Sequence, residues 1–289
     1  MIQHSACVLA VGKFEGIHLG HRALISQVVR RARAAGIAAV VAVFEPHPYK
    51  FLRDADYKPL FSPHERDEMI YALGVDTIVS FDFNEKFASM SARDFCEKIF
   101  IEMRAKEIIA GENFRFGRER GGTIETLRGA GEVFVIGREN FVGEIVSTSR
   151  IRELLAGKDF FAAESLLGFS FFIAGEVTEG RRLGRTLGFP TLNIYPPSEK
   201  FLPQNGVYAT RTIIDGATYS SVTNIGTRPT VSDGEGISVE THIWEAAPGE
   251  LYGTQIKVEF LRFIRAEKKF ASLDELKGQI AEDIASIRQ

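Results

Sequence analysis

A glycine-rich turn near the start of the chain is the feature that most constrains the fold. The run Cys7–Val11 is short and apolar, as in a buried strand, and apolar residues recur at helical spacing from Leu24 to Ala35, before Gly36. Between these elements lies Gly12–His21, with the sequence Gly-Lys-Phe-Glu-Gly-Ile-His-Leu-Gly-His. Backbone amides at a helix start favour bound phosphate. The pattern therefore predicts a phosphate-binding turn between a strand and a helix.

Three interpretations of His18 and His21 are open at this point. In a phosphate site, Gly20 allows close approach of the backbone and the imidazoles contact phosphate oxygens. A His-x-x-His pair can also bind metal, but no third Cys, His or acidic residue lies nearby at ligand spacing. The third interpretation is two surface histidines beside a turn.

The first half of the chain alternates strand and helix patterns. Strands are predicted at Val8–Val11, Ala38–Phe44, Thr77–Phe81, Glu107–Ala110 and Val133–Ile136, and helices at Ala23–Ala35, Pro63–Leu73 and Ala92–Met103. This alternation is typical of a parallel sheet with helices on both faces, in which ligands bind beyond the carboxyl ends of the strands. The turn Gly12–His21, Pro46-His47-Pro48 and Gly111–Phe114 are therefore expected to converge on one crevice.

The second half has a different pattern, which predicts an antiparallel barrel. A helical stretch at Arg150–Leu167 comes first, and Asp215-Gly216 is a strong hairpin signal. Strands are predicted at Phe171–Val177, Val207–Ile214, Thr218–Ile225, Ser238–Trp244 and Ile256–Phe263. A capping box at Ser272–Glu275 opens a terminal helix, whose apolar stripe is expected to pack against the barrel: Leu276, Ile280, Ile284 and Ile287. The predicted domains are residues 1–167 and 168–289.

The segment Gly180–Asn193 is the densest motif of the second half, with three glycines among three arginines. Such a loop can wrap phosphates with amides and cations, although it is not a P-loop, because Arg185 replaces the lysine and the glycine spacing differs. The hydroxyl of Thr191 and the amide of Asn193 are oxygen donors that suit magnesium bound with nucleotide phosphates. The alternative is a glycine-rich barrel turn with solvated arginines.

Glu240 is the candidate general base of the second half. Strand alternation places Glu240, His242 and Trp244 on one face of Ser238–Trp244. A carboxylate on a rigid strand can accept a proton from a substrate hydroxyl. The alternative is a glutamate that faces water.

The composition gives no reason to expect nucleic acid or a membrane as a partner. The formal net charge of −3 over 289 residues gives no electrostatic reason to expect nucleic acid or an anionic membrane. The two cysteines, Cys7 and Cys96, form no metal or redox motif and are expected to be reduced and buried. Neither a signal peptide nor a membrane-spanning run is recognised, so a cytoplasmic location is expected. The oligomeric state has no signal in the sequence.

Taken together, the motifs resemble those of the bifunctional bacterial riboflavin kinase/FMN adenylyltransferase family, the FAD synthetases. The resemblance covers essentially the whole chain in the correct order. In the first half it rests on Gly12–His21, Phe44–Pro48, Gly111–Gly117 and Ser147–Arg152. In the second half it rests on Gly184–Asn193, Gly206–Tyr208, Asn224–Thr230, Val239-Glu240, Leu251–Gly253 and Phe263–Arg265.

The resemblance implies two reactions on two domains. A Rossmann-like nucleotidyltransferase domain would join FMN to AMP from ATP, giving FAD and pyrophosphate. By resemblance, His18 and His21 are catalytic there, and Pro46 and Pro48 lie beside the flavin. The residues that would contact ATP in this domain are Gly12, Phe14, Gly20, Asn113, Ser147, Thr148 and Arg152.

The C-terminal β-barrel with its terminal helix would phosphorylate riboflavin to FMN with ATP. By resemblance, Glu240 is the general base, and Thr191 and Asn193 hold Mg²⁺. The residues that would contact ATP in this domain are Gly184, Arg185, Gly188 and Pro190.

The chain departs from the family pattern at five positions in four motifs. Glu15 replaces the usual aspartate of Phe-Asp-Gly, Ser147-Thr148-Ser149 keeps every hydroxyl of Ser-Ser-Thr, and Leu192 replaces an alanine. Ile145 stands where an arginine is usual, so one phosphate-binding cation is missing. This motivates the alternative of a riboflavin kinase whose N-terminal domain binds nucleotide or flavin but is impaired in adenylyl transfer. A separate hypothesis, from another class of function, is that the N-terminal domain is a flavin- or nucleotide-binding regulatory module.

Overall fold

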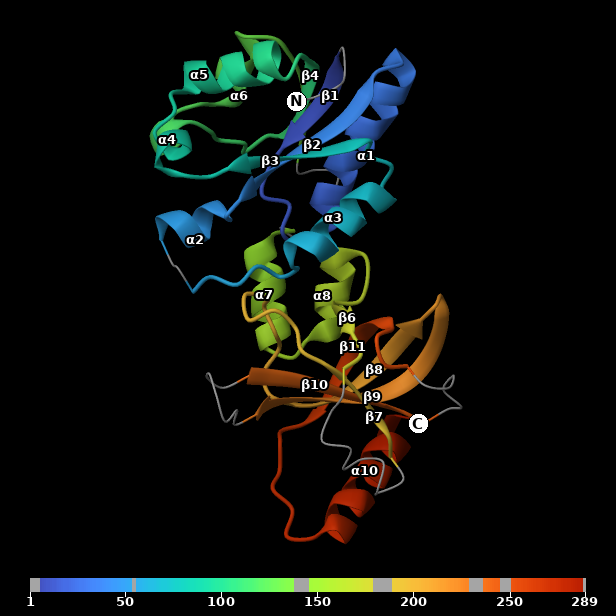
Figure 1. Ribbon diagram of the computed structural model, residues 1–289. Helices are drawn as coiled ribbons and strands as arrows, with labels where there is room; N and C mark the ends of the chain where they lie inside the picture. The colour runs from blue at the N-terminus through green and yellow to red at the C-terminus, as the bar shows by residue number, and fades with distance from the viewer. Residues whose placement is uncertain are drawn as a thin grey trace. The chain divides into compact units, whose positions relative to one another are not determined.

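The computed structural model describes residues 6–53, 56–137, 146–178, 189–228, 236–244 and 251–287. The chain divides into two compact units, Met1–Thr148 and Ser149–Gln289, and each is described here by itself (Figure 1). The first unit is a parallel α/β structure and the second is antiparallel, so the predicted fold class is confirmed.

The first unit contains a five-stranded parallel sheet in the order β3-β2-β1-β4-β5. All five predicted strands are present: β1 (Cys7–Val11), β2 (Ala38–Glu45), β3 (Thr77–Asp82), β4 (Ala105–Gly111) and β5 (Glu132–Ile136). Central β1 is buried throughout. Its neighbours β2 and β4 are reached by connections in opposite directions, which makes the carboxyl end of β1 the topological switch point.

Helices cover both faces of this sheet. Among the described residues of this unit they are α1 (Leu19–Ala35), α2 (Pro48–Leu52), α3 (Pro63–Ala72), α4 (Glu85–Ala88), α5 (Ala92–Glu97) and α6 (Ile124–Arg128), with a π-helical segment at Lys98–Glu102 and a 3₁₀ turn at Arg118–Arg120. Alternate side chains of β1 point to opposite faces. Val8 therefore packs with Ile25 of α1, whereas Leu9 packs in the cluster that contains Phe95 of α5.

The structure refines one sequence expectation for this unit and adds three short helices. The predicted helix Ala92–Met103 is α-helical only to Glu97 and continues as the π-helical segment. The helices α2, α4 and α6 have five, four and five residues, which is too short for a periodic pattern to be recognised. Gly36 ends α1 in the left-handed conformation with φ 64°, as its position suggested.

The second unit contains a curled six-stranded antiparallel sheet in the order β6-β11-β8-β9-β10-β7. Its strands are β6 (Phe172–Glu176), β7 (Thr191–Ile194), β8 (Gly206–Ile214), β9 (Ala217–Arg228), β10 (Gly236–Ile243) and β11 (Gln255–Arg265). Beyond β6, Thr178 N donates to Asn193 O of β7 at 2.9 Å, which links the two edge strands. The Asp215-Gly216 hairpin is confirmed, with φ 48° and 80° as a type I′ turn requires.

The helices in the described part of the second unit are α7, α8 (Phe160–Leu167) and α10 (Leu273–Ile287), and α7 (Thr148–Ala156) begins at the last residue of the first unit. The predicted helical stretch Arg150–Leu167 is thus two helices, because Lys158 adopts φ 67° and Asp159 caps α8 through Ala162 N at 3.0 Å. β7 was not predicted as a strand, since four residues after a proline give little alternation.

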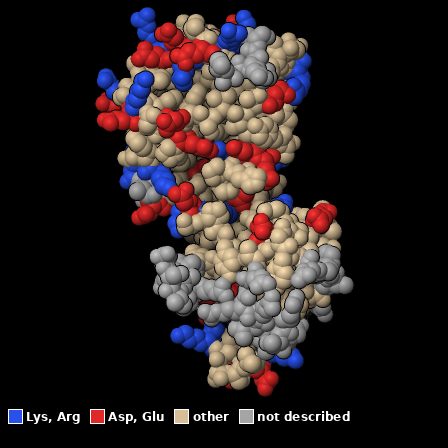
Figure 2. Space-filling view, in the orientation of Figure 1, with Lys and Arg blue, Asp and Glu red and all other residues tan. Residues whose placement is uncertain are grey.

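Charged side chains of both signs are interspersed over the face of the first unit that Figure 2 shows. A mixed surface of this kind creates no broad field of one sign. Among the described residues, none of the helices combines the length and the hydropathy needed to cross a lipid bilayer.

A ladder of hydroxyl groups crosses the buried side of the antiparallel sheet. Thr210 Oγ1 lies 2.8 Å from the hydroxyls of both Ser221 and Thr223. Thr212 continues the chain from Ser221 at 2.8 Å, and Thr241 continues it from Thr223 at 2.9 Å. All five side chains are at most 1% exposed, so the ladder satisfies buried polar groups that water cannot reach.

We expect Thr210→Val to lower the free energy of unfolding of the second unit by about 1–3 kcal/mol, because two buried hydroxyls lose a partner. Trp244, the only tryptophan of the chain, reports the unfolding of this unit by fluorescence in urea. The matched control is Thr218→Val at an exposed position of β9, with a change within about 0.5 kcal/mol. Equal midpoints for the two variants would contradict the prediction.

Candidate active sites

The two histidines of the first unit lie in one stacked pair at the start of α1. His18 is the N-cap residue, and its Nδ1 accepts a hydrogen bond from His21 N at 3.3 Å. The two rings stack with centroids 3.7 Å apart and an interplanar angle of 16°. Phe14 contacts His21 edge-on at 5.2 Å. The pair is therefore fixed in the first turn of the helix.

Both imidazoles are neutral near pH 7. Burial lowers the pKa of His18 to about 4. Burial also lowers the pKa of His21 well below its usual value, with further contributions from His18 and Lys13. Because Nδ1 of His18 accepts a hydrogen bond, its proton is on Nε2, which can donate to an anion. With the amides and the dipole at the helix start, this is an arrangement that suits phosphate oxygens.

The turn that carries the histidines has a strained backbone. Phe14 and Ile17 adopt φ 48° and 38°, a region that costs non-glycine residues on the order of 1–3 kcal/mol each. A Cβ on Gly12 would lie 2.9 Å from the Phe14 ring. A Cβ on Gly16 would lie 3.1 Å from Oγ1 of Thr148, so this hydroxyl packs directly against the turn.

The other predicted residues of this site follow adjacent strands. Asn113 is exposed in the turn after β4, Pro46 follows β2 and Pro48 begins α2. Parallel strands end at the same edge of a sheet, so these segments gather at the edge where the turn leaves β1. Arg152 belongs to the second unit, where its guanidinium lies 5.1 Å from the Phe201 ring centre. Its predicted contact with ATP stays a prediction.

The second unit contains a cavity with a volume of about 310 Å³. Residues from five strands, the adjoining loops and α10 line it, among them Phe189, Thr191, Asn224, Glu240, His242, Arg265, Ile280 and Asp283. Strand pairing places Glu240 directly between Asn193 of β7 and Asn224 of β9. Cross-strand neighbours share a face of the sheet, so a carboxylate and two amides are next to one another.

His242 holds the segment that leads to Thr191. Its Nδ1 donates to Pro190 O at 2.9 Å, and the Phe189 ring contacts it edge-on at 5.2 Å. Burial lowers the pKa of His242, so the ring is neutral near pH 7. The predicted face of β10 with Glu240 and His242 is thus the face that lines the cavity.

The donor set of this cavity fits a hard divalent cation. Thr191 and Glu240 line the cavity with a hydroxyl and a carboxylate, and the buried Asn193, which pairs with Glu240 across the sheet, has an amide oxygen. Asn193 Nδ2 donates to Thr191 O at 3.4 Å, so the amide oxygen is the side-chain atom suited to a cation. Among the described residues, no three His, Cys, Asp or Glu side chains cluster in a way that could hold a metal ion, so the donors of this set include a hydroxyl and an amide.

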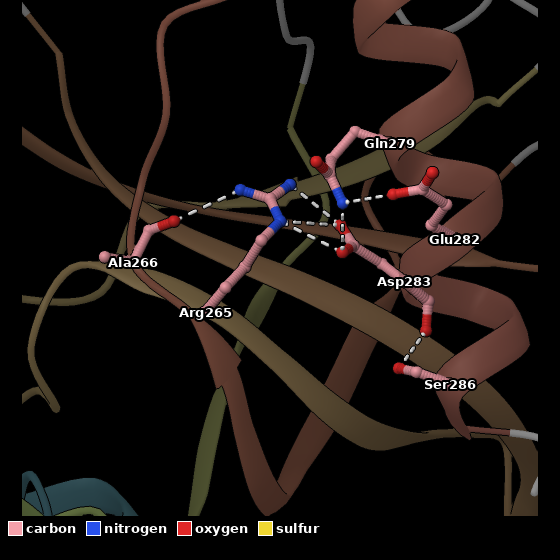
Figure 3. Close-up of polar contacts among 6 residues, drawn as sticks. All are labelled: Arg265, Ala266, Gln279, Glu282, Asp283 and Ser286. Atoms are coloured by element: carbon pink, nitrogen blue, oxygen red, sulfur yellow. Dashed lines mark hydrogen bonds and ion pairs between the residues drawn. The ribbon is translucent and has the colours of Figure 1, made fainter.

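Helix α10 forms one wall of the cavity and is tied to β11 by an ion pair (Figure 3). Arg265 Nε and Nη2 lie 2.9 and 2.7 Å from the carboxylate oxygens of Asp283, whose side chain is 4% exposed. Gln279 donates to the same carboxylate at 3.3 Å. The predicted packing of the helix stripe against the barrel is confirmed, and Leu276 and Ile280 also face the cavity.

Several residues show the limits of the sequence analysis. Gly184, Arg185, Gly188 and Ile145 lie outside the described residues. Asn224 was part of a recognised motif, yet only the β9–β10 register reveals that it neighbours Glu240. Arg265 also belonged to a recognised motif, but its ion pair with Asp283 was missed, because no local pattern connects residues this far apart in the chain.

Comparisons with known proteins agree with this two-site architecture. The FAD synthetase family model matches residues 1–137 and the riboflavin kinase family model matches residues 167–289. The chain is 37% identical to the bifunctional riboflavin kinase/FMN adenylyltransferase of Escherichia coli K12, over 98% of this chain and 92% of that protein. The corresponding Bacillus subtilis protein is 35% identical, over 97% and 91%. A crystal structure described as a macrolide-efflux protein from Streptococcus pneumoniae has a TM-score of 0.85 at 30% identity, over 99% and 95%.

The buried histidine predicts a pH-dependent stability of the first unit. The unfolded chain, with a His18 pKa near 6.5, takes up a proton before the folded chain, whose pKa is about 4. The contribution of the neutral His18 ring to the free energy of unfolding is therefore fully present above pH 6.5 and is lost as the pH falls towards 4. Between pH 7 and 5 the wild type should lose about 2 kcal/mol more than His18→Asn, which keeps a capping side chain. Urea unfolding followed by circular dichroism measures this, and parallel pH profiles would contradict it.

Proposed function

The chain belongs to the bifunctional riboflavin kinase/FMN adenylyltransferase family, and we propose which residues carry each of its two reactions. It is an enzyme that phosphorylates riboflavin to FMN and adenylylates FMN to FAD. The observation that carries the assignment of residues is the separation of two chemically different sites. One is a neutral imidazole pair at a helix start, and the other is a carboxylate on a strand inside a cavity.

In the kinase reaction, Glu240 accepts the proton of the ribityl 5′-hydroxyl as this oxygen attacks the γ-phosphorus of ATP. The P–O bond to ADP breaks as the new P–O bond forms. Strand pairing on both sides holds the carboxylate in a fixed position, as general base catalysis requires. Thr191 and Asn193 would hold Mg²⁺, which neutralises phosphate charge when it is bound.

In the adenylyl transfer, the phosphate of FMN is already a nucleophile and attacks the α-phosphorus of ATP. Pyrophosphate leaves as the FMN–AMP bond forms. The protein needs to position the reactants and to stabilise charge that spreads over the phosphates. Nε2–H of His18, the His21 ring and the amides at the start of α1 serve this purpose. Because the two imidazoles are neutral in the folded protein, they form no ion pairs that would compete with the phosphates.

The remaining assignments extend the two sites. ATP in the first site contacts Gly12, Phe14, Gly20, Asn113, Ser147, Thr148 and Arg152, the flavin lies beside Pro46 and Pro48, and ATP in the second site contacts Gly184, Arg185, Gly188 and Pro190. The packing of Thr148 on Gly16 supports the first set.

We place the functional domains at residues 1–167 and 168–289, supported by the kinase family match that begins at residue 167, whereas the compact units of the structure divide after Thr148. A cytoplasmic location is supported by the free, buried thiols of Cys7 and Cys96. The alternative of a kinase alone finds no support in the relatives, which carry both activities in their names.

Replacing Glu240 with glutamine should lower the rate of riboflavin phosphorylation about 10²–10⁴-fold, because the amide cannot accept the proton. Adenylylation of supplied FMN should stay within about twofold of wild type, since another unit performs it. Chromatography of riboflavin, FMN and FAD with fluorescence detection measures both steps in one preparation. Loss of both steps would refute the separation of the sites.

His21→Ala should give the opposite result. FAD formation from FMN and ATP should fall about 10²–10³-fold, as expected when a transition-state contact is removed, while riboflavin phosphorylation continues. Incubation with riboflavin, ATP and Mg²⁺ would then accumulate FMN. An unchanged yield of FAD would remove His21 from the mechanism.

A further inference from the structure

Glu15 lies inside the strained turn, and its carboxylate contacts a different part of the first unit. The side chain is buried, with 5% of the residue exposed. Tyr57 Oη donates to Glu15 Oε1 at 2.5 Å, and His47 Nε2 lies 3.6 Å from Oε2. Both partners come from the connection between β2 and α3, more than thirty positions further along the chain. We refer to Glu15, His47 and Tyr57 as the Glu15 cluster.

The hydrogen bonds of His47 orient it toward the carboxylate. Its Nδ1 accepts from Tyr49 N at 3.2 Å, so in the neutral ring the proton is on Nε2, the atom that faces Glu15. The His47 ring also stacks on the Tyr57 ring, with centroids 4.8 Å apart and an interplanar angle of 20°. His47 and Tyr57 thus contact each other as well as the carboxylate, so each residue of the cluster contacts both of the others.

The position of Glu15 in the chain indicates that this cluster holds the strained turn in place. The residues with positive φ, Phe14 and Ile17, flank Glu15 and Gly16, and His18 follows directly. A strained backbone persists only where the surroundings hold it. Between these two residues Glu15 has the one polar side chain, which accepts a hydrogen bond at Oε1 and lies 3.6 Å from the His47 ring at Oε2. The cluster therefore ties the strained segment to the neighbouring connection at the point where the histidine pair begins.

We propose that Glu15 is a positioning residue for adenylyl transfer, which acts by holding the turn that places His18 and His21. The proposal rests on the proposed role of these histidines. It also gives a meaning to a departure from the family pattern, because a glutamate reaches one methylene further than the usual aspartate. The expected effect is on the rate of the chemical step, since a displaced donor weakens binding of the transition state more than binding of the substrates.

The test uses the full-length protein and measures kcat and KM for FAD formation with FMN and MgATP varied. Glu15→Ala should lower kcat about 10- to 100-fold and leave both KM values within about threefold. Glu15→Gln, which keeps the length and can accept from Tyr57, should recover most of the rate. Riboflavin phosphorylation in the same preparations is the internal control, and it should not change.

Tyr57→Phe provides a second variant that removes a single oxygen and is expected to fold. It should lower kcat for FAD formation by a smaller factor than Glu15→Ala, and the double variant should be no slower than Glu15→Ala alone. The matched control is Tyr71→Phe on the exposed surface of α3, with wild-type kinetics.

The possible results separate the proposal from its premise. The inference is wrong if Glu15→Ala keeps the wild-type kcat, if its effect appears in KM alone, or if kinase activity falls with it. It is also wrong if Tyr57→Phe behaves like Tyr71→Phe. If His21→Ala keeps full FAD formation, the premise on the histidines fails. If His21→Ala is inactive and Glu15→Ala is not, only the present inference fails.

Discussion

The first unit depends on one constraint, the sharp passage from a fully buried strand into a helix. β1 is covered on both faces, so its direction is fixed by the core, and α1 must begin within a few residues of its end. Along this passage Phe14 and Ile17 adopt positive φ values, and glycines stand where the Phe14 ring and the Thr148 hydroxyl pack closely. The same short connection buries the imidazoles, which lowers their pKa values, and it places the start of α1 at the carboxyl edge of the sheet.

The two units solve a common problem, the handling of phosphate charge, with different groups. The first presents neutral donors and backbone amides, as suits a reaction whose nucleophile already carries charge. The second presents a carboxylate between two amides, as suits a hydroxyl that must lose its proton. In both, the important side chains lie on or directly beside regular elements, where core packing restricts their movement.

Local patterns in the sequence are sufficient to predict the helices and strands whose apolar residues recur at a regular spacing, and turns with a characteristic residue pair. Apolar spacing and turn chemistry predict the five parallel strands, the hairpin at Asp215-Gly216 and the face of β10 that Glu240 and His242 share. Contacts between distant segments have no such pattern. Asn224 reaches Glu240 through register, and Tyr57 reaches Glu15 across 42 positions. Each depends on tertiary packing, which one sequence does not display.

The ion pair between Arg265 and Asp283 has a consequence for the order in which the protein becomes competent during synthesis. The wall that α10 contributes to the kinase cavity comes from residues made after every strand of the second unit. A growing chain that has not reached Leu273 already contains the complete first unit, whereas its kinase cavity is open on one side. The site whose reaction must come first, because it makes FMN, is therefore the later of the two to be completed on the ribosome.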